Sequence, residues 1–438
     1  MTDCFVPQLT FSFYRKPICA NFRGGEMSSD SGLLLLRRFD ERHQLTRGLA
    51  QDVDEQRRAQ DIDHPLLALL RQRLYAICAG YEDANDAQHL RHDPILKLIS
   101  ERELDETLAS QPTLSRLENT VTPRSLARLN HRLLDWFVRL CGQQVRQHGE
   151  ILLDVDSTPD PTHGQQQLSL FNGHYGKRIY HPLLIFERHS GCLLDVRLRR
   201  GNCVSYNRVV PRLRRLLRRL RQAFPGVPIR LRADAGFAFA PLYDLLEEYG
   251  VGYAIRLVKS DPLRHHAAAT VAQAASDYQS TQQAQRQFTA FTYQMGTWPH
   301  PRRVVAKAEH DAQHHDLFFL VSSENDPAEA VFEFYNGRGE CENRIAELKN
   351  GFHADRLSCP RFLANAFRLL LHSLAYNLVN LFRHHLPARF RRTQIDGLRQ
   401  RLFKVGARVL QTTRRIWVYL ATGWPGQDDF CAAAAACG

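Results

Sequence analysis

The strongest constraint on the fold is the order of strand-like and helix-like patterns between residues 150 and 258. Three apolar, strand-like runs come first, and two helix-like patterns then alternate with two further strand-like runs. The strands are expected at 150–156, 179–187, 192–198, 228–233 and 252–258, and the helices at 209–224 and 241–249. A meander followed by alternating helices and strands predicts an α/β fold class.

This order resembles the ribonuclease H-like fold, a likeness that by itself assigns no function. We expect the core to comprise residues 146–258 and, after an interruption, a long helix within residues 326–360. Residues 259–325 are rich in Ala, Gln, Ser and His before they turn strand-like, and we interpret them as an inserted, mainly β subdomain. The periodicity of apolar residues predicts flanking helical regions at 1–145 and 361–438, of which the second is basic.

Three acidic residues lie at positions suited to phosphodiester chemistry. Asp156 ends the first predicted strand, Asp234 ends the fourth, and Glu342 lies in the helix after the insertion. Cleavage with two metal ions needs acids that converge on ions roughly 3.5–4 Å apart. Each acid alone is also compatible with an ordinary turn or surface role, because acids at strand ends are commonly turn formers.

The helical periodicity around Glu342 distinguishes this carboxylate from those of Glu340 and Glu347, which project away from it. At about 100° per residue, Tyr335, Arg338, Glu342 and Lys349 fall within an arc of roughly 60°. An apolar stripe adjoins this arc, so the polar side chains lie at the margin of a buried face. The alternative is an exposed salt bridge between Arg338 and Glu342, four residues apart, worth a few tenths of a kcal/mol.

These residues resemble a known family. The spacing Tyr335-x2-Arg338-x3-Glu342-x6-Lys349 matches the YREK signature of DDE transposases from bacterial insertion sequences. The stretch 232–237, RADAGF, resembles their second acidic motif, and Asp156-Ser157-Thr158 resembles the first. With the upstream segment 108–116, the likeness is greatest to the insertion-sequence-1380 group and extends over nearly the whole chain.

The resemblance implies a transposase that cleaves and transfers DNA strands with two Mg²⁺ or Mn²⁺ ions. It implies that Asp156, Asp234 and Glu342 bind the ions. Tyr335, Arg338 and Lys349 would contact the backbone of the transposon end, and the insertion would close over that end. The expected partners are the double-stranded DNA of the terminal inverted repeats and of the target, bound by a homodimer, with the helical region 1–145 contributing to end binding.

Two further residues carry alternatives. Trp298, in the insertion, is a candidate to stack on a flipped base, as related transposases that form hairpins use a tryptophan there; otherwise it fills the core of the subdomain.

Asp154 and Asp156 share one face of their strand, about 6.6–6.8 Å apart. We favour Asp156 as the metal ligand because it matches the family motif, and Asp154 would then orient a ligand or a basic side chain.

The charge of the chain agrees with a nucleic-acid partner. The 438 residues include 58 Lys and Arg against 46 Asp and Glu, a formal charge of +12. Such a surplus suggests a polyanion, because phosphate backbones release counterions when they are bound. The predicted helix 209–224 surrounds an apolar stripe with arginines, which are either a solvated face or phosphate contacts.

Other classes of protein fit the sequence less well. The apolar stretches are shorter than the roughly 20 residues of a membrane span and the first residues lack a signal peptide, so we expect no membrane partner and a cytoplasmic location. The ten cysteines form no C-x-x-C pair and are expected to be free thiols. Two alternatives remain: a non-catalytic DNA-binding protein derived from a transposase, and another ribonuclease H-like nuclease.

Overall fold

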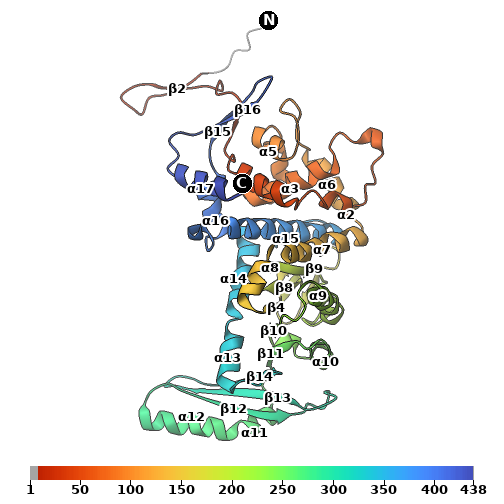
Figure 1. Cartoon of the computed structure of the whole chain (residues 1–438), viewed down its shortest axis with the longest axis vertical. Helices are drawn as coiled ribbons and strands as arrows, with labels where there is room; N and C mark the ends of the chain where they lie inside the picture. Colours follow the sequence, from red (N-terminus) through yellow and green to blue (C-terminus); the bar gives the residue numbers. More distant parts are fainter. Residues whose placement is uncertain (1–7, 438) are drawn as a thin grey trace. The chain divides into compact units, whose positions relative to one another are not determined.

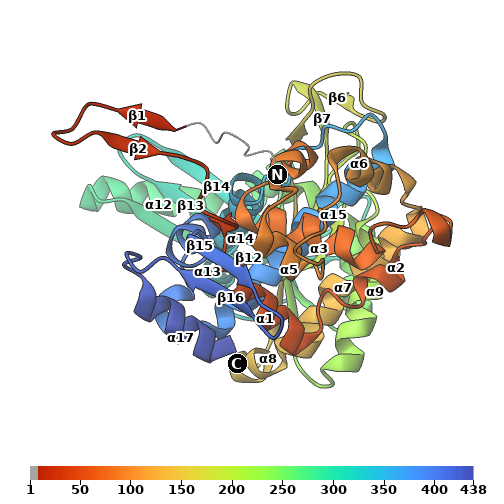
Figure 2. The ribbon, with the colours of Figure 1, turned by 90° about the horizontal axis from the view of Figure 1, so that it is seen from above.

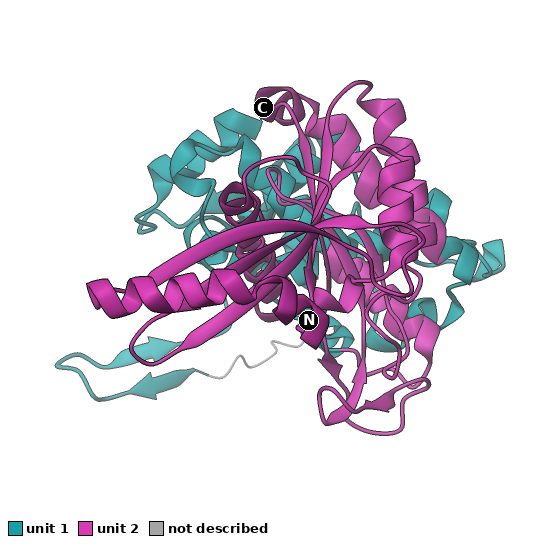
Figure 3. Ribbon diagram, turned by 90° about the horizontal axis from the view of Figure 1, so that it is seen from below, with its two compact units in different colours: residues 1–125, 351–356, 374–438 teal, residues 126–350, 357–373 magenta. Residues whose placement is uncertain are grey.

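The computed structural model describes residues 8–437, which form two compact units (Figure 3). The first unit combines residues 1–125, 351–356 and 374–438, and the second combines residues 126–350 and 357–373. Each unit is therefore built from segments that are distant in the sequence. None of the described helices is long and apolar enough to cross a membrane.

The second unit is organised around an eight-stranded sheet with the order β12-β13-β14-β11-β10-β4-β8-β9 (Figure 1). Its strands are β4 (Ile151–Ser157), β8 (Leu183–Glu187), β9 (Leu193–Arg197), β10 (Ile229–Ala233), β11 (Gly252–Leu257), β12 (Gln285–Tyr293), β13 (Arg302–His310) and β14 (His315–Ser322). The strands β4, β8 and β9 form an antiparallel meander, whereas β10 is parallel to both β4 and β11. The sheet is thus mixed, with β11 and β10 at its centre and β4 next to β10.

The register of the two parallel strands brings two acids to one edge of the sheet. Val155 of β4 pairs with Ala233 of β10, and Asp156 and Asp234 each follow one residue later. Two helices, α9 (Val209–Ala223) and α10 (Ala240–Glu248), lie on one side of the sheet in Figure 1. On the other side lie α13 (Ala328–Asn336) and α14 (Gly339–Ala346).

The expected strands and helices of the core match the observed ones, with one exception. The run predicted as a single strand at 179–187 is two strands, β7 (Lys177–Tyr180) and β8. Pro182 stands between them, and proline cannot donate a hydrogen bond to a sheet ladder. The strand β7 instead joins β5 (Asp160–Pro161) and β6 (Leu170–Asn172) in a small separate sheet, seen in Figure 2 as a hairpin of β6 and β7.

The segment 259–325 differs from the expected β subdomain in two ways. Its first part is helical, forming α11 (Asp261–His266) and α12 (Ala268–Thr281), in keeping with the high helix propensity of its alanines. Its three strands do not form a sheet of their own. They extend the main sheet, because β14 pairs antiparallel with β11 and covers an edge that would otherwise expose unpaired backbone groups.

The long helix expected before residue 350 is interrupted. The helix α13 ends at Asn336, α14 begins at Gly339, and residues Glu347–Gly351 form a π-helical turn. A side chain on Gly337 would place its Cβ 2.6 Å from Nη1 of Arg232, so only glycine lets this arginine approach the helix. Packing against Arg232 thus explains the glycine at position 337, and its low helix propensity agrees with the break.

The first unit is mainly helical but contains strands that the sequence did not predict. It includes the hairpin of β1 (Leu9–Phe11) and β2 (Ile18–Ala20), visible in Figure 2. It also includes a three-stranded sheet of β3 (Met27–Ser28), β15 (Ala407–Gln411) and β16 (Ile416–Leu420). The region 361–438 was expected to be helical, yet β15 and β16 lie in it. The helices of the first unit are α1 (Leu33–His43), α2 (Leu49–Asp52), α3 (Leu66–Ala79), α4 (Ala87–Leu90), α5 (Pro94–Ile99), α6 (Gln111–Thr120), α16 (Ile395–Leu398) and α17 (Gln427–Cys437). The second unit contains α8 (Gly142–His148) and most of α7 (Pro123–Leu140), and α15 (Phe362–His385) is divided between the two units.

The cysteines are free thiols, as expected, at the nine positions that the structure describes. The tenth, Cys4, lies outside the described residues. Cys141 and Cys192 approach each other within the second unit, with their Sγ atoms 3.8 Å apart in the core.

A buried ion pair joins the sheet to α13. Asp154 of β4 and Arg232 of β10 are register partners, and the guanidinium donates two hydrogen bonds of 2.7 and 2.8 Å to the carboxylate. A third bond of 2.8 Å runs from Nη1 of Arg232 to the carbonyl of Phe334 in α13. The two charged side chains are only 1% and 3% exposed, so all their partners come from the protein.

We predict that replacing Arg232 with Leu strongly destabilises the protein. The change leaves the buried carboxylate of Asp154 without a cation, a loss of about 3–5 kcal/mol in the free energy of unfolding. Arg230→Leu is the matched control on the same strand, because its pair with Glu150 is 30% and 18% exposed and is worth about 1 kcal/mol at most. Chemical denaturation of both variants measures the difference, and equal losses would contradict the role given to the buried pair.

Candidate active site

Two carboxylates lie where neighbouring parallel strands end. Asp156 is buried, 6% exposed, and its Oδ1 accepts a hydrogen bond of 2.8 Å from the backbone N–H of Ser157. Asp234 begins the short 3₁₀ helix η3 (Ala235–Phe237), and its Oδ1 accepts a bond of 2.9 Å from the N–H of Gly236. Each acid thus keeps a second carboxylate oxygen directed to other partners.

Arg338 connects these two acids with the third. Its Nη2 lies 2.6 Å from Oδ2 of Asp156 and 4.0 Å from Oδ2 of Asp234, and its Nη1 lies 3.6 Å from Oε1 of Glu342. The side chain of Arg338 is 13% exposed, whereas that of Glu342 is 69% exposed. The predicted contact between Arg338 and Glu342 therefore exists, but the guanidinium binds the buried Asp156 more closely.

The three acids do not converge on a single point in this structure. Among residues 8–437, the one group of three Asp, Glu, His or Cys side chains whose ligand atoms all lie within 4.8 Å of one another is Asp244, Glu247 and His300. That group was not predicted from the sequence, although two of its acids are three residues apart on α10. The guanidinium of Arg302 already occupies it, 2.5 Å from Asp244 and 2.7 Å from Glu247, which makes it an ion-pair cluster.

Burial and like charges determine the protonation of Asp156. Burial raises the pKa of this carboxyl from 3.8 to about 6, and the negative charges of Asp234 and Glu342 act in the same direction. The positive charge of Arg338 opposes them. Asp156 is therefore a carboxylate at neutral pH whose charge is held in a poorly solvated position, a state that a further cation would stabilise.

The other two residues of the helix that were predicted to contact DNA, Lys349 and Tyr335, lie in different surroundings. The Nζ of Lys349 donates a hydrogen bond of 2.6 Å to the carbonyl of Pro159, three residues beyond Asp156. Tyr335 packs at the edge of the apolar cluster between α13 and the sheet, and burial raises the pKa of its phenol. The structure thus brings Arg338 and Lys349 to the chain around Asp156, and it places Tyr335 at the margin of the core.

Trp298 packs as a core residue. It is 4% exposed, and its ring meets those of Tyr243 and Tyr293 edge-on, with centroids 5.5 and 5.9 Å apart. The guanidinium carbon of Arg302 lies 5.7 Å from its centroid. These contacts agree with the alternative in which the indole fills the core, and they leave no exposed ring face for a base.

The sequence did not reveal an open cavity of about 660 Å³ beside Asp234. Aromatic and polar side chains line it, among them Phe171, Tyr175, Ser205 and Tyr206. The loop 198–208 forms part of this wall and approaches Asp234 closely, because a Cβ on Gly236 would come within 2.7 Å of Ser205. The cavity is large enough to receive a substrate next to the acids.

The buried Arg199 holds this loop. Its Nη1 donates to the carbonyls of Ser205 and Asn207, at 2.6 and 2.9 Å, and its Nε donates to the carbonyl of His181 at 2.7 Å. A single side chain thereby links the loop that carries Ser205 to the backbone at His181, and both residues line the cavity. Only the three-dimensional packing shows this role, since nothing in the local pattern around Arg199 distinguishes it from other arginines.

Comparison with known proteins gives one family. The model of a family described as transposase DDE domain group 1 matches residues 12–437. Among solved structures, the chain is similar to one in a complex described as a piggyBac transposase synaptic complex with hairpin DNA. The identity is 12% and the TM-score 0.43, over 86% of this chain and 80% of that chain. No curated protein sequence matches the chain.

The raised pKa of Asp156 predicts a pH-dependent stability of the metal-free protein. Between pH 3.8 and about 6 the folded state retains a proton that the unfolded state has released, so this group lowers the free energy of unfolding as the pH rises through that window. Asp156→Asn removes the effect. The variant should exceed the wild type above pH 6 by on the order of 2 kcal/mol and lose this advantage near pH 4. Urea unfolding across the range measures it, and a pH-independent difference would contradict the assignment.

Proposed function

Because the chain belongs to the family of group 1 DDE transposase domains, we propose that it binds the terminal inverted repeats of a mobile element and cleaves and transfers their strands. The observation that carries the proposal is the meeting of Asp156 and Asp234 at one sheet edge, with Arg338 linking both to Glu342. The enzyme would be a DDE transposase of the YREK class, most like the insertion-sequence-1380 group. Its substrate would be the double-stranded DNA of element ends and target.

We assign a ribonuclease H-like core to the strands β9, β8, β4, β10 and β11. In support, the order from the meander inward is third, second, first, fourth and fifth, with the last two parallel to the first. Such a sheet opens at the carboxyl ends of its parallel strands, where ligands of α/β proteins usually bind. Asp156 and Asp234 occupy those ends.

The three acids suit two Mg²⁺ or Mn²⁺ ions. Their donors are carboxylate oxygens, which these hard cations prefer, and the guanidinium between them indicates that the position favours positive charge. Asp156, Asp234 and Glu342 would hold the ions. Bound there, such ions supply activation of an attacking oxygen and stabilisation of the leaving oxygen.

The residues of the chain itself would place the DNA. In the protein without metal, Arg338 balances the charge of the acids, and we propose that it turns to a phosphate of the bound strand. Lys349 would contact the strand close to Asp156, and Tyr335 would support the helix and border the backbone. A homodimer would bring two element ends together, with the helical region 1–145 adding contacts to the ends.

We predict that Glu342→Gln abolishes strand nicking and leaves DNA binding nearly intact, because it removes a metal ligand without removing a cation. Glu340→Gln is the matched control, two residues away on α14, where Glu340 pairs with Arg188. Nicking of the element's own ends with Mg²⁺ and with Mn²⁺, and gel shifts, measure both properties. Full nicking by Glu342→Gln would refute the assignment, and wild-type binding without any nicking would favour the non-catalytic alternative.

For Arg338 we predict opposite effects on metal and on DNA. Arg338→Gln should bind Mn²⁺ about tenfold more tightly in the absence of DNA, since a positive charge a few ångströms away opposes the ion by one to a few kcal/mol. The same variant should bind DNA more weakly. Calorimetric titration with Mn²⁺ and fluorescence anisotropy test this, with Arg188→Gln as control. An unchanged Mn²⁺ affinity would show that Arg338 does not compete with the ions.

A further inference from the structure

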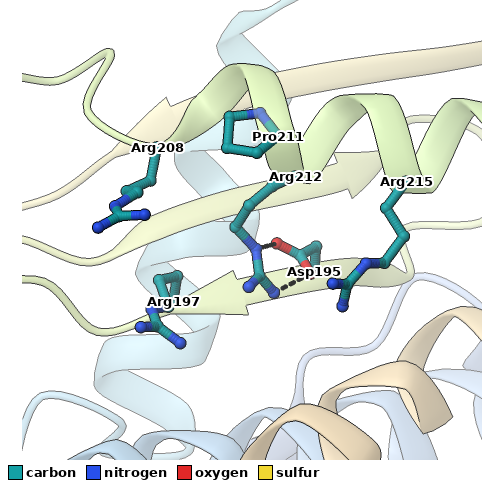
Figure 4. A pocket seen from close by; sticks show the side chains of 6 residues that line it. All are labelled: Asp195, Arg197, Arg208, Pro211, Arg212 and Arg215. Carbon is teal, nitrogen blue, oxygen red and sulfur yellow. Dashed lines mark hydrogen bonds and ion pairs between the residues drawn. The ribbon is translucent and has the colours of Figure 1, made fainter.

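A basic site lies beside β9, the outermost strand of the sheet, apart from the acids just described. It is a cavity of about 190 Å³ between β9 and the start of α9, shown in Figure 4. We call it the arginine pocket, and it is lined by Asp195, Arg197, Arg208, Pro211, Arg212 and Arg215. Its volume corresponds to several water molecules at about 30 Å³ each, enough for a small anionic group and some hydration.

The positive charge of the arginine pocket is largely uncompensated. Asp195 is its single carboxylate, and both of its oxygens accept hydrogen bonds from Arg212. Arg215 donates a hydrogen bond of 2.8 Å to Nε2 of His131. The imidazole of His131 therefore acts as a neutral acceptor and supplies no negative charge. Within residues 8–437, the guanidinium groups of Arg197 and Arg208 make no hydrogen bond or salt bridge, although the backbone of Arg197 pairs in β9. Four guanidinium groups thus share one carboxylate.

The backbone adds to this positive potential. Arg208 immediately precedes α9, with φ of 65° and ψ of 8°, in the left-handed region that residues other than glycine seldom adopt. The positive end of the α9 dipole lies at this first turn, although the N–H of Val209 already bonds to the carbonyl of Tyr206 and Pro211 has no N–H. Figure 4 shows Arg208 and Arg212 extending from this turn toward Arg197 on β9. The guanidinium groups therefore face a common space.

The arginine pocket is continuous in the chain with the wall of the catalytic cavity. The loop held by Arg199 carries Ser205 and Tyr206 beside Asp234, and Arg208 follows only two residues later. Two residues span at most about 7 Å. Duplex DNA carries one charge per about 1.7 Å of its axis, so a duplex engaged at Asp234 presents several phosphates within that reach.

We propose that the arginine pocket binds phosphodiester groups of the DNA on which the active site acts, at positions away from the bond that is cut. Arginine suits this task, because its planar guanidinium forms paired hydrogen bonds with phosphate oxygens. The proposal rests on the proposed function and deepens it. It assigns to Arg197 and Arg208 a contact that helps to hold the strand leaving the active site.

The test uses the salt dependence of DNA binding by the full chain. A labelled short duplex is titrated with wild type, Arg197→Gln, Arg208→Gly and the double variant between about 50 and 200 mM salt. Each lost phosphate contact should reduce the slope of log K against log salt by about 0.9, and the double variant by about 1.8. Arg214→Gln is the matched control, because Arg214 lies on the same helix but pairs with the exposed Glu248. Its slope should stay unchanged.

Arg208→Gly separates binding from folding. Glycine adopts the left-handed conformation of residue 208 without strain, so the Tm of this variant should not fall while its DNA affinity does. A slope in the double variant equal to that of the wild type overturns the proposal, as does an equal reduction in Arg214→Gln. If millimolar inorganic phosphate raises the Tm of the wild type only, and the DNA slopes agree, the pocket takes free phosphate and the proposal is wrong.

The outcome is distinguishable from a failure of the proposed function. Nicking of DNA by the wild type with Mg²⁺ tests that function and does not depend on the slopes. A wild type that nicks, with unchanged slopes in the variants, overturns the arginine pocket alone. The wild type could instead bind DNA without nicking it, while the double variant shows the reduced salt slope. That result overturns the catalytic assignment and supports the arginine pocket.

Discussion

The ion pair of Asp154 and Arg232 determines where the acids of the site can lie. It forms across two parallel strands in a region without solvent, where each charge needs its partners within the protein. Because Arg232 also binds the carbonyl of Phe334, the same interaction sets the position of α13 against those strands. Asp156 lies near the end of β4, Asp234 follows β10 and Arg338 follows α13. These three residues are therefore positioned by an ion pair in which none of them takes part.

The chain uses guanidinium groups in two physically different ways. In the core, Arg232 is fixed by three hydrogen bonds and has no alternative partner of comparable strength. At the sheet edge, Arg338 has one short contact and two long ones, so exchange for another anion costs less. Like charges in a poorly solvated site repel one another. The guanidinium of Arg338 therefore reduces the repulsion between the carboxylates of Asp156, Asp234 and Glu342 in the protein alone.

Local patterns were sufficient for most of the core strands and for helix α9, because these depend on periods of two and 3.6 residues. They were also sufficient to place Asp156 and Asp234 at strand ends. They failed where the outcome depended on distant partners. The pairing of β14 with β11 and the hairpin of β15 and β16 are settled by neighbours outside each strand's own sequence, and residue spacing carries no information about them.

The loop between β9 and α9 has a consequence for genetic studies of this protein. Arg199 lies inside the molecule and touches neither the acids nor the arginine pocket, yet it holds the segment that borders both. Loss of this one side chain would release the segment and disturb two regions together. A screen for inactive alleles would therefore recover substitutions of Arg199 as readily as substitutions of Asp156 or Asp234. The Arg199 variants would combine a defect at the cavity beside Asp234 with a defect at the arginine pocket.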